Sequence, residues 1–183
     1  MLEEISDIKT PEDILEFMNK YIQYGYLGVN GEEYINTLKN FRKLYRTFSI
    51  EDTLKHGIGT CVEQVNLMHY LLTKINIPSR MFCTRVYEGE DFNNLEAEEH
   101  MHCFILYFID DRVFQIEHPN PDRIGIHEYT NIDDAIEIIK EYYEKKSEGV
   151  VRQLTEYKEI PLGLTFKELN CYINSLTEFK KEL

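Results

Sequence analysis

Apolar and polar residues follow two different periods along the chain, and the change between them separates helical from strand-forming parts. Up to Asn76, apolar residues recur every three or four positions, which places them on one face of a helix. The most regular stripe starts at Cys61 and continues through Val65, Met68, Leu72 and Ile75. We therefore predict a buried helix that begins at Cys61 and ends near Asn76.

Capping residues and apolar faces predict further helices on both sides of this one. A capping threonine, a proline and two acids at Thr10 to Asp13 have the order of a helix start, and Gly25 ends the pattern. Tyr24 to Gly28 is predicted as a loop. The other predicted helices cover Glu33 to Arg46, Ser49 to His56, Asn131 to Lys146, and Thr165 to Lys180.

After Pro78 the period shortens to two, which is typical of strands. Predicted strands cover Met81 to Tyr87, His102 to Ile109, Arg112 to Glu117, and Val150 to Tyr157, with a turn at Asp110-Asp111. The acidic stretch Glu88 to Glu99 is predicted as a surface loop. Helices before and after a central antiparallel sheet indicate the α+β class. We expect one domain over residues 1–183, with its motifs between about 50 and 120.

Charge and cysteine content narrow the function classes. The 183 residues include 33 acidic and 20 basic ones, giving a net charge of −13 that would repel nucleic acids and anionic membranes. No apolar run is long enough to span a membrane, and Met1-Leu2-Glu3-Glu4 does not resemble a signal peptide. We therefore expect a soluble, cytoplasmic protein whose four cysteines are thiols, with Cys83, Cys103 and Cys171 in the core.

Cys61 is the candidate nucleophile, because the loop Gly57 to Thr60 leads directly into its predicted helix. In the first turn, unpaired N–H groups and the helix dipole favour a thiolate. A catalytic cysteine also needs a base and a group that orients the base. A two-residue turn at Asp110-Asp111 places His102 and Glu117 on one face of a hairpin, as diagonal neighbours roughly 7–8 Å apart. Glu117 could then hold one imidazole nitrogen and leave the other for Cys61.

Two other histidines compete for this role. A three-residue turn or a bulge would turn Glu117 to the opposite face and bring His118 forward instead. His100 lies two positions before His102 and could share its face, although it follows a run of acids typical of a loop. Buried structural roles also remain open for Cys61, His102 and Glu117.

The stretch from Gly57 to Pro119 resembles the transglutaminase-like superfamily of papain-related cysteine enzymes. The motifs that carry the resemblance are Gly59-Thr60-Cys61, Asn76-Ile77-Pro78-Ser79-Arg80, His102-Cys103-Phe104 and Glu117. The resemblance implies a papain-like fold in which the nucleophile helix packs on the central sheet. It also implies Cys61 as nucleophile, His102 as base and Glu117 as orienting acid. Glu117 stands where the family usually has aspartate, and Phe104 where it usually has tryptophan.

This combination predicts a cysteine-dependent acyl-transfer enzyme that acts on amide bonds of a peptide or protein, of the peptide, isopeptide or glutamine type. We favour hydrolysis over transfer to an amine, and expect neither a metal nor a cofactor. The Cys61 backbone N–H and the Tyr24 side chain are candidate oxyanion donors, and Thr60 is a candidate substrate contact.

Two other hypotheses remain open. The departures at Glu117 and Phe104 are compatible with a catalytically silent binding module of the same fold. His100, His102 and Cys103, together with His118 or Cys61, offer nitrogen and sulfur ligands of the kind that zinc prefers. The spacing of these residues matches no common structural zinc pattern, and neighbouring residues on a strand point to opposite faces.

Overall fold

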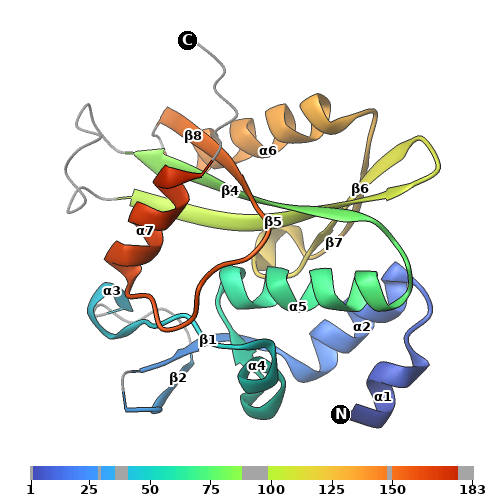
Figure 1. Cartoon of the computed structure of the whole chain (residues 1–183). Coiled ribbons are helices and arrows are strands. Elements are labelled where there is room, and N and C mark those ends of the chain that lie inside the picture. The colour runs from blue at the N-terminus through green and yellow to red at the C-terminus, as the bar shows by residue number, and fades with distance from the viewer. Residues whose placement is uncertain (1, 29, 36–40, 88–98, 148–149, 177–183) are drawn as a thin grey trace.

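The structure, a computed structural model, describes residues 2–28, 30–35, 41–87, 99–147 and 150–176. Figure 1 shows an antiparallel sheet between helices, and a smaller sheet near the N-terminal part of the chain. The α+β class predicted from the sequence is therefore confirmed. The bounds of the helices are α1 (Leu2–Asp7), α2 (Pro11–Tyr21), α3 (Phe41–Leu44), α4 (Ile50–His56), α5 (Cys61–Lys74), α6 (Ile132–Ser147) and α7 (Phe166–Ser175), with a 3-10 turn at Pro121–Arg123.

The larger sheet has the strand order β7-β6-β5-β4-β8, and its neighbouring strands are all antiparallel. The smaller sheet has the order β2-β1-β3, in which β3 runs parallel to β1. The bounds of the strands are β1 (Gln23–Leu27), β2 (Glu33–Ile35), β3 (Ile58–Gly59), β4 (Ser79–Tyr87), β5 (Glu99–Ile109), β6 (Arg112–Glu117), β7 (Gly125–Tyr129) and β8 (Val150–Tyr157).

The β5–β6 hairpin has the register that the sequence predicted. Ile105 pairs with Ile116, and Ile109 pairs with Arg112, so Asp110 and Asp111 form a two-residue turn. Asp110 has a positive φ of 53°, a conformation that aspartate tolerates in tight turns. The alternative of a three-residue turn is therefore excluded.

Two predictions in the N-terminal third are wrong. Tyr24 to Gly28 was expected to be a loop, but Gln23–Leu27 forms strand β1. Glu33 to Arg46 was expected to be one helix, but Glu33–Ile35 pairs with β1 as β2, and the described helix α3 covers only Phe41–Leu44. Pairing within the small sheet satisfies the backbone of these strands, and this contact between distant segments outweighs the local helical pattern.

Two hydrophobic cores lie on opposite faces of the larger sheet. The core on the α5 face also includes side chains from α2 and α7, whereas α6 covers the other face (Figure 1). Cys61 belongs to the first core, and Phe104 to the second. Burial of apolar area on both faces is the main term that holds α5 and α6 against the sheet.

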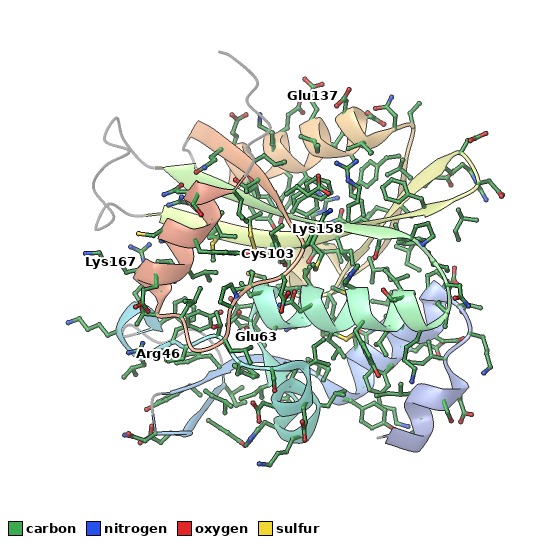
Figure 2. All side chains as sticks on the ribbon, viewed as in Figure 1. Arg46, Glu63, Cys103, Glu137, Lys158 and Lys167 are labelled. Atoms are coloured by element: carbon green, nitrogen blue, oxygen red, sulfur yellow. A yellow bond between two sulfur atoms is a disulfide. The ribbon has the colours of Figure 1, made fainter. Side chains whose placement is uncertain are left out.

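A disulfide joins β4 to β5. Cys83 and Cys103 face each other across the two strands and are bonded through their sulfurs, so the expectation that both are free thiols is wrong (Figure 2). Both are fully buried, as predicted. Cys171 is free and exposed on α7, so its predicted place in the core is also wrong, because it lies on the outward side of that helix. Cys61 is the other free thiol.

Within the described residues, no helix combines the length and the apolar character needed to cross a membrane. The predicted acidic loop lies outside the described residues except for Glu99, which begins β5.

Candidate active site

The loop before α5 approaches the helix closely, and this approach requires glycine. Gly57 ends α4 in the left-handed conformation, with a φ of 67°. A Cβ atom on Gly59 would lie 2.9 Å from the Glu63 Cβ, which is too close for any other residue. Gly59 pairs with Tyr24 of β1, so the small sheet holds the loop in place. The helix can therefore begin at Cys61 with its first turn against the loop.

A capping box holds the first turn of α5. The Thr60 hydroxyl accepts a hydrogen bond from the Val62 N–H, and the Glu63 carboxylate accepts one from the Thr60 N–H at 3.0 Å. Glu63 also accepts hydrogen bonds from the Thr60 hydroxyl and from the Tyr45 hydroxyl. Burial raises the pKa of Glu63, and these hydrogen bonds oppose the rise. Cys61 is thus placed by a helix start that is rigid and almost fully buried.

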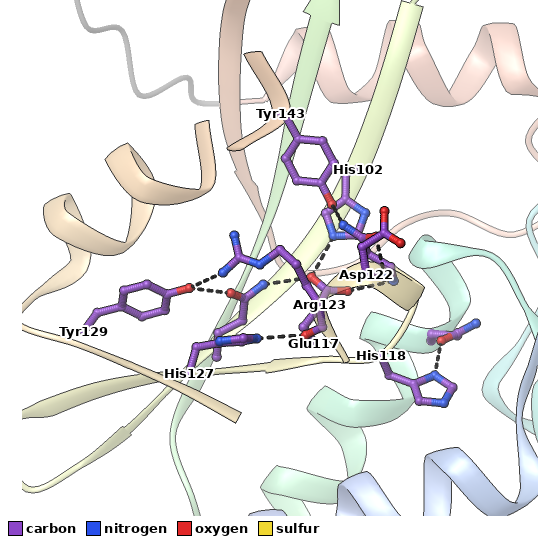
Figure 3. Close-up of polar contacts among 11 residues, drawn as sticks. His102, Glu117, His118, Asp122, Arg123, His127, Tyr129 and Tyr143 are labelled. Carbon is purple, nitrogen blue, oxygen red and sulfur yellow. Dashed lines mark hydrogen bonds and ion pairs between the residues drawn. The ribbon is translucent and has the colours of Figure 1, made fainter. Parts of the chain in front are cut away.

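The hairpin brings His102 and Glu117 into direct contact. The His102 Nε2 lies 2.9 Å from the Glu117 Oε2, and both side chains are buried. Gln115 and Glu117 lie two positions apart on β6, so both side chains point to the sheet face that bears His102. Glu117 accepts two further hydrogen bonds, from the Gln115 Nε2 at 2.8 Å and from the Asn120 N–H at 3.0 Å. Its carboxylate is therefore fixed by three donors (Figure 3).

Gln115 is itself held by a chain of polar contacts that ends at a cation. The Tyr129 hydroxyl donates to the Gln115 Oε1 at 2.7 Å, and the Arg123 Nη2 donates to the Tyr129 hydroxyl at 2.9 Å (Figure 3). Tyr129 lies on β7, so this edge strand helps to orient the carboxylate. The sequence analysis did not identify this support for Glu117.

Cys61 lies close enough to His102 for its side chain to affect the pKa of the imidazole. Because Glu117 occupies Nε2, the Nδ1 side of the ring is left for the sulfur. Burial by itself lowers the pKa of His102, but the charge of Glu117 and the interactions of the imidazolium N–H groups with Cys61 and Glu117 outweigh it and raise the pKa to about 10. The imidazole is therefore protonated at neutral pH, next to the sulfur. A protonated histidine beside a cysteine favours the thiolate.

Tyr143 of α6 covers the other side of the histidine ring. The two rings are stacked with centroids 4.8 Å apart, and the Asn120 Nδ2 donates to the Tyr143 hydroxyl at 3.0 Å. Only 5% of the Cys61 surface and 7% of the His102 surface is exposed to solvent. The sulfur and the imidazole thus lie in a largely dry environment, where charges interact strongly.

His118 faces away from the Cys61–His102–Glu117 cluster and contacts α5. Its Nδ1 donates to the Gln64 Oε1 at 2.6 Å, and the Gln64 Nε2 donates to the Gly59 carbonyl at 2.7 Å. Burial lowers the pKa of His118, which favours the neutral ring. His118 therefore ties the glycine loop to α5 and is not the partner of Cys61. The side chain of His100 lies outside the described residues.

The structure brings His102 into contact with Glu117, as the hairpin register predicted, and Cys61 lies near the same ring. The catalytic roles of these three residues stay predictions. Tyr24 is placed beside Gly59, two residues before the sulfur, and its role as a donor stays a prediction. The Thr60 hydroxyl is engaged in the cap, and its contact with substrate also stays a prediction.

The sequence analysis gave Gln115 no role. It missed Asn120, Tyr129 and Tyr143 as parts of the site. The spacing of Gln115 and Glu117 on one strand could have indicated their contact. Tyr143 gave no such signal, because its position depends on how α6 packs on the sheet.

The hypothesis of a metal site receives no support from the described side chains. No group of three histidine, cysteine or acidic residues among them could hold a metal ion. Cys103, one of the proposed ligands, is in the disulfide.

A scan against protein-family models finds no matching family, and a search of curated proteins finds no matching sequence.

Proposed function

We propose that this protein is a cysteine-dependent acyl-transfer enzyme that acts on amide bonds, with Cys61 as nucleophile, His102 as acid and base, and Glu117 as the acid that orients the imidazole. The observation that carries the proposal is the buried contact of 2.9 Å between the His102 ring and the Glu117 carboxylate, and Cys61 lies close enough to the same ring to raise its pKa. Together with the sequence motifs, the contact between His102 and Glu117 and the nearness of Cys61 support membership of the transglutaminase-like superfamily.

In the proposed reaction, the Cys61 thiolate attacks the carbonyl carbon of an amide. The carbonyl electron pair moves to oxygen, and its return breaks the carbon–nitrogen bond. His102 gives its proton to the leaving nitrogen, and the acyl group remains on the sulfur as a thioester. Water then attacks the thioester carbonyl while His102 takes a proton from the water, and the carbon–sulfur bond breaks to release the carboxylic acid and the thiolate. The Glu117 carboxylate balances the charge of the imidazolium through its contact with His102. Three donors hold it in place, so it needs no rearrangement during the reaction.

We favour hydrolysis of a peptide or isopeptide bond as the overall reaction. The limited exposure of Cys61 suits a slender acyl group, such as an extended backbone or the side-chain amide of a glutamine or an isopeptide. The net charge of −13 favours substrates that are neutral or basic.

Alkylation with iodoacetamide at pH 5.5 tests the nucleophile, because the chain provides its own control. Cys61 and Cys171 are the two free thiols, and Cys171 is exposed whereas Cys61 is buried. Accessibility alone would make Cys171 react first. If His102 activates the sulfur, Cys61 reacts at least tenfold faster, as measured by mass spectrometry of peptides, and His102→Gln abolishes this advantage.

Faster labelling of Cys171 at this pH, with Cys61 reacting only in unfolded protein, would contradict the proposal. That result would favour a binding module that has the fold without the activity. The Cys171→Ser variant is the matched control and should leave the rate at Cys61 unchanged.

A further inference from the structure

Four side chains at the β6–β7 edge of the larger sheet are joined by hydrogen bonds that all run in one direction. The Arg123 Nη2 donates to the Tyr129 hydroxyl at 2.9 Å, and that hydroxyl donates to the Gln115 Oε1 at 2.7 Å. The Gln115 Nε2 then donates to the Glu117 Oε2 at 2.8 Å. The same Oε2 atom contacts the His102 ring, so the chain leads from the guanidinium to the imidazole (Figure 3).

The direction of these hydrogen bonds is set at the outer end by Arg123. A guanidinium has donors but no acceptor, so the Tyr129 oxygen accepts from it and the phenol proton is left for Gln115. Burial raises the pKa of Tyr129, so the phenol keeps this proton at neutral pH. The His127 Nε2 donates to the Arg123 carbonyl at 2.8 Å, and the Arg123 Cζ lies 5.0 Å from the centre of the Tyr142 ring. None of the ion pairs between described residues involves Arg123, so its guanidinium serves the phenol and not a carboxylate.

This direction decides which end of the Gln115 amide faces Glu117. The amide has an oxygen that accepts and a nitrogen that donates. Turning the amide over would place its oxygen against the carboxylate, where two acceptors repel each other, and would leave the phenol proton without an acceptor. Gln115 is 1% and Tyr129 is 7% exposed, so water has little access to replace a lost contact.

We propose that Arg123 and Tyr129 are positioning residues for the reaction. Through Gln115 they hold the Glu117 carboxylate in the place where it contacts His102. The inference rests on the function proposed above, and neither residue needs to touch the substrate. The hydrogen bonds of the chain stay the same whether or not the imidazole carries its second proton, so the carboxylate keeps its place during the reaction. Such support from outside the reacting groups preserves the geometry on which catalysis depends.

The pH profile of Cys61 alkylation by iodoacetamide tests this role, because alkylation follows the thiolate that the imidazolium stabilises. Tyr129→Phe removes the donor to the Gln115 oxygen and frees the amide to turn over. We expect the midpoint pH at which Cys61 becomes reactive to rise by about one unit, which is about a tenfold loss of thiolate below the midpoint. A change that only destabilised the fold would lower the melting temperature and leave this midpoint in place.

A double-mutant cycle shows whether Tyr129 acts through Gln115. Gln115→Met keeps the length of the side chain, removes both polar groups and should raise the midpoint by itself. Adding Tyr129→Phe to Gln115→Met should then move the midpoint by less than about 0.3 of a unit. Arg123→Met should raise the midpoint as Tyr129→Phe does. Arg123→Lys retains a cationic donor and should restore at least half of that shift.

Tyr172→Phe is the matched control. The Tyr172 hydroxyl donates to the Glu159 carbonyl, and Tyr172 lies on α7, which contributes no residue to the chain from Arg123 to Glu117. This variant also loses a phenol hydrogen bond and should keep the wild-type midpoint. A melting curve checks that every variant is folded.

Failure of this inference and failure of the proposed function give different results. A wild-type midpoint in folded Tyr129→Phe, while Cys61 still reacts faster than Cys171, overturns the positioning role and leaves the proposed function standing. Full additivity of Tyr129→Phe and Gln115→Met also overturns the role, because Tyr129 would then act by another route. A wild-type protein in which Cys61 has no advantage over Cys171 overturns both.

Discussion

At the scale of single residues, the feature that decides the chemistry is the buried pair of His102 and Glu117. Bringing two ionisable groups out of water is unfavourable unless their charges and hydrogen bonds are satisfied. Gln115 and Asn120 donate hydrogen bonds to the carboxylate, and Cys61 lies near the imidazole and helps to raise its pKa. The balance favours a charged histidine, and this preference affects stability as well as reactivity.

The pH dependence of unfolding measures this preference. The pKa of His102 is raised to about 10 in the folded protein, compared with an ordinary value of 6.5. The resulting stabilisation is fully present below about pH 6.5, and it is lost as the pH rises to 10. Over this range the free energy of unfolding should fall with a slope of up to about 1.4 kcal/mol per pH unit. Glu117→Gln, which removes the opposing charge, should abolish this slope.

Urea denaturation of both proteins between pH 6 and pH 10 provides the measurement. The variant is less stable at every pH because Gln115 and Asn120 lose a charged acceptor, so the informative quantity is the difference in slope. Parallel curves for the two proteins would rule out a stabilising interaction between His102 and Glu117.

The contact between His102 and Glu117 could be predicted from the sequence because both residues lie on one hairpin. The length of the turn at Asp110-Asp111 sets the register, and the register sets which side chains share a face. His102 and Glu117 could therefore be paired by counting. The hydroxyls of Tyr129 and Tyr143 reach the same cluster from β7 and α6, whose packing cannot be counted along the chain.

At the scale of elements, α5 is specified by its own sequence to an unusual degree. The glycine loop, the capping threonine and the apolar stripe all predict a start at Cys61, and the helix begins there. By contrast, β1 and β2 were missed because neither has a strong pattern by itself. Gly25 in β1 suggested a break, and the apolar spacing after Glu33 suggested a helix, whereas pairing between the two strands decides the outcome.

Substitution of Thr60 tests how far α5 depends on its cap. Thr60→Val keeps the shape of the side chain but removes the oxygen that accepts from Val62 and donates to Glu63. We expect a loss of about 1–2 kcal/mol in the free energy of unfolding, measured by chemical denaturation. Thr60→Ser retains the hydroxyl and should lose less than half of that amount. Equal losses would show that packing of the methyl group, and not the cap, stabilises the helix start.

At the scale of the whole molecule, the sheet carries the site between its two cores. The sulfur comes from a helix on one face, and the histidine stacks on a helix that covers the other. The disulfide was not predicted because free thiols were expected to follow from a cytoplasmic location. Cys83 and Cys103 are far apart in sequence but opposite each other across two strands, and only the pairing of β4 with β5 reveals this.

Reduction of the disulfide provides a measure of its contribution. Its two cysteines are 20 positions apart, and closing a loop of this size stabilises a folded protein by about 3 kcal/mol. For a chain of this length, we expect dithiothreitol to lower the melting temperature by about 6–12 °C. The double variant Cys83→Ala, Cys103→Ala should melt at one temperature with and without the reductant. An unchanged wild-type melting temperature would show that the bond contributes nothing.

The same bond has a consequence for a chain that has been cut. A single backbone cleavage between Cys83 and His102 leaves Cys61 on one piece and His102 and Glu117 on the other, and the disulfide still tethers the two pieces. A nicked molecule would therefore migrate as one species on a non-reducing gel and as two after reduction. Its two pieces would separate under denaturing conditions only once a reductant had been added.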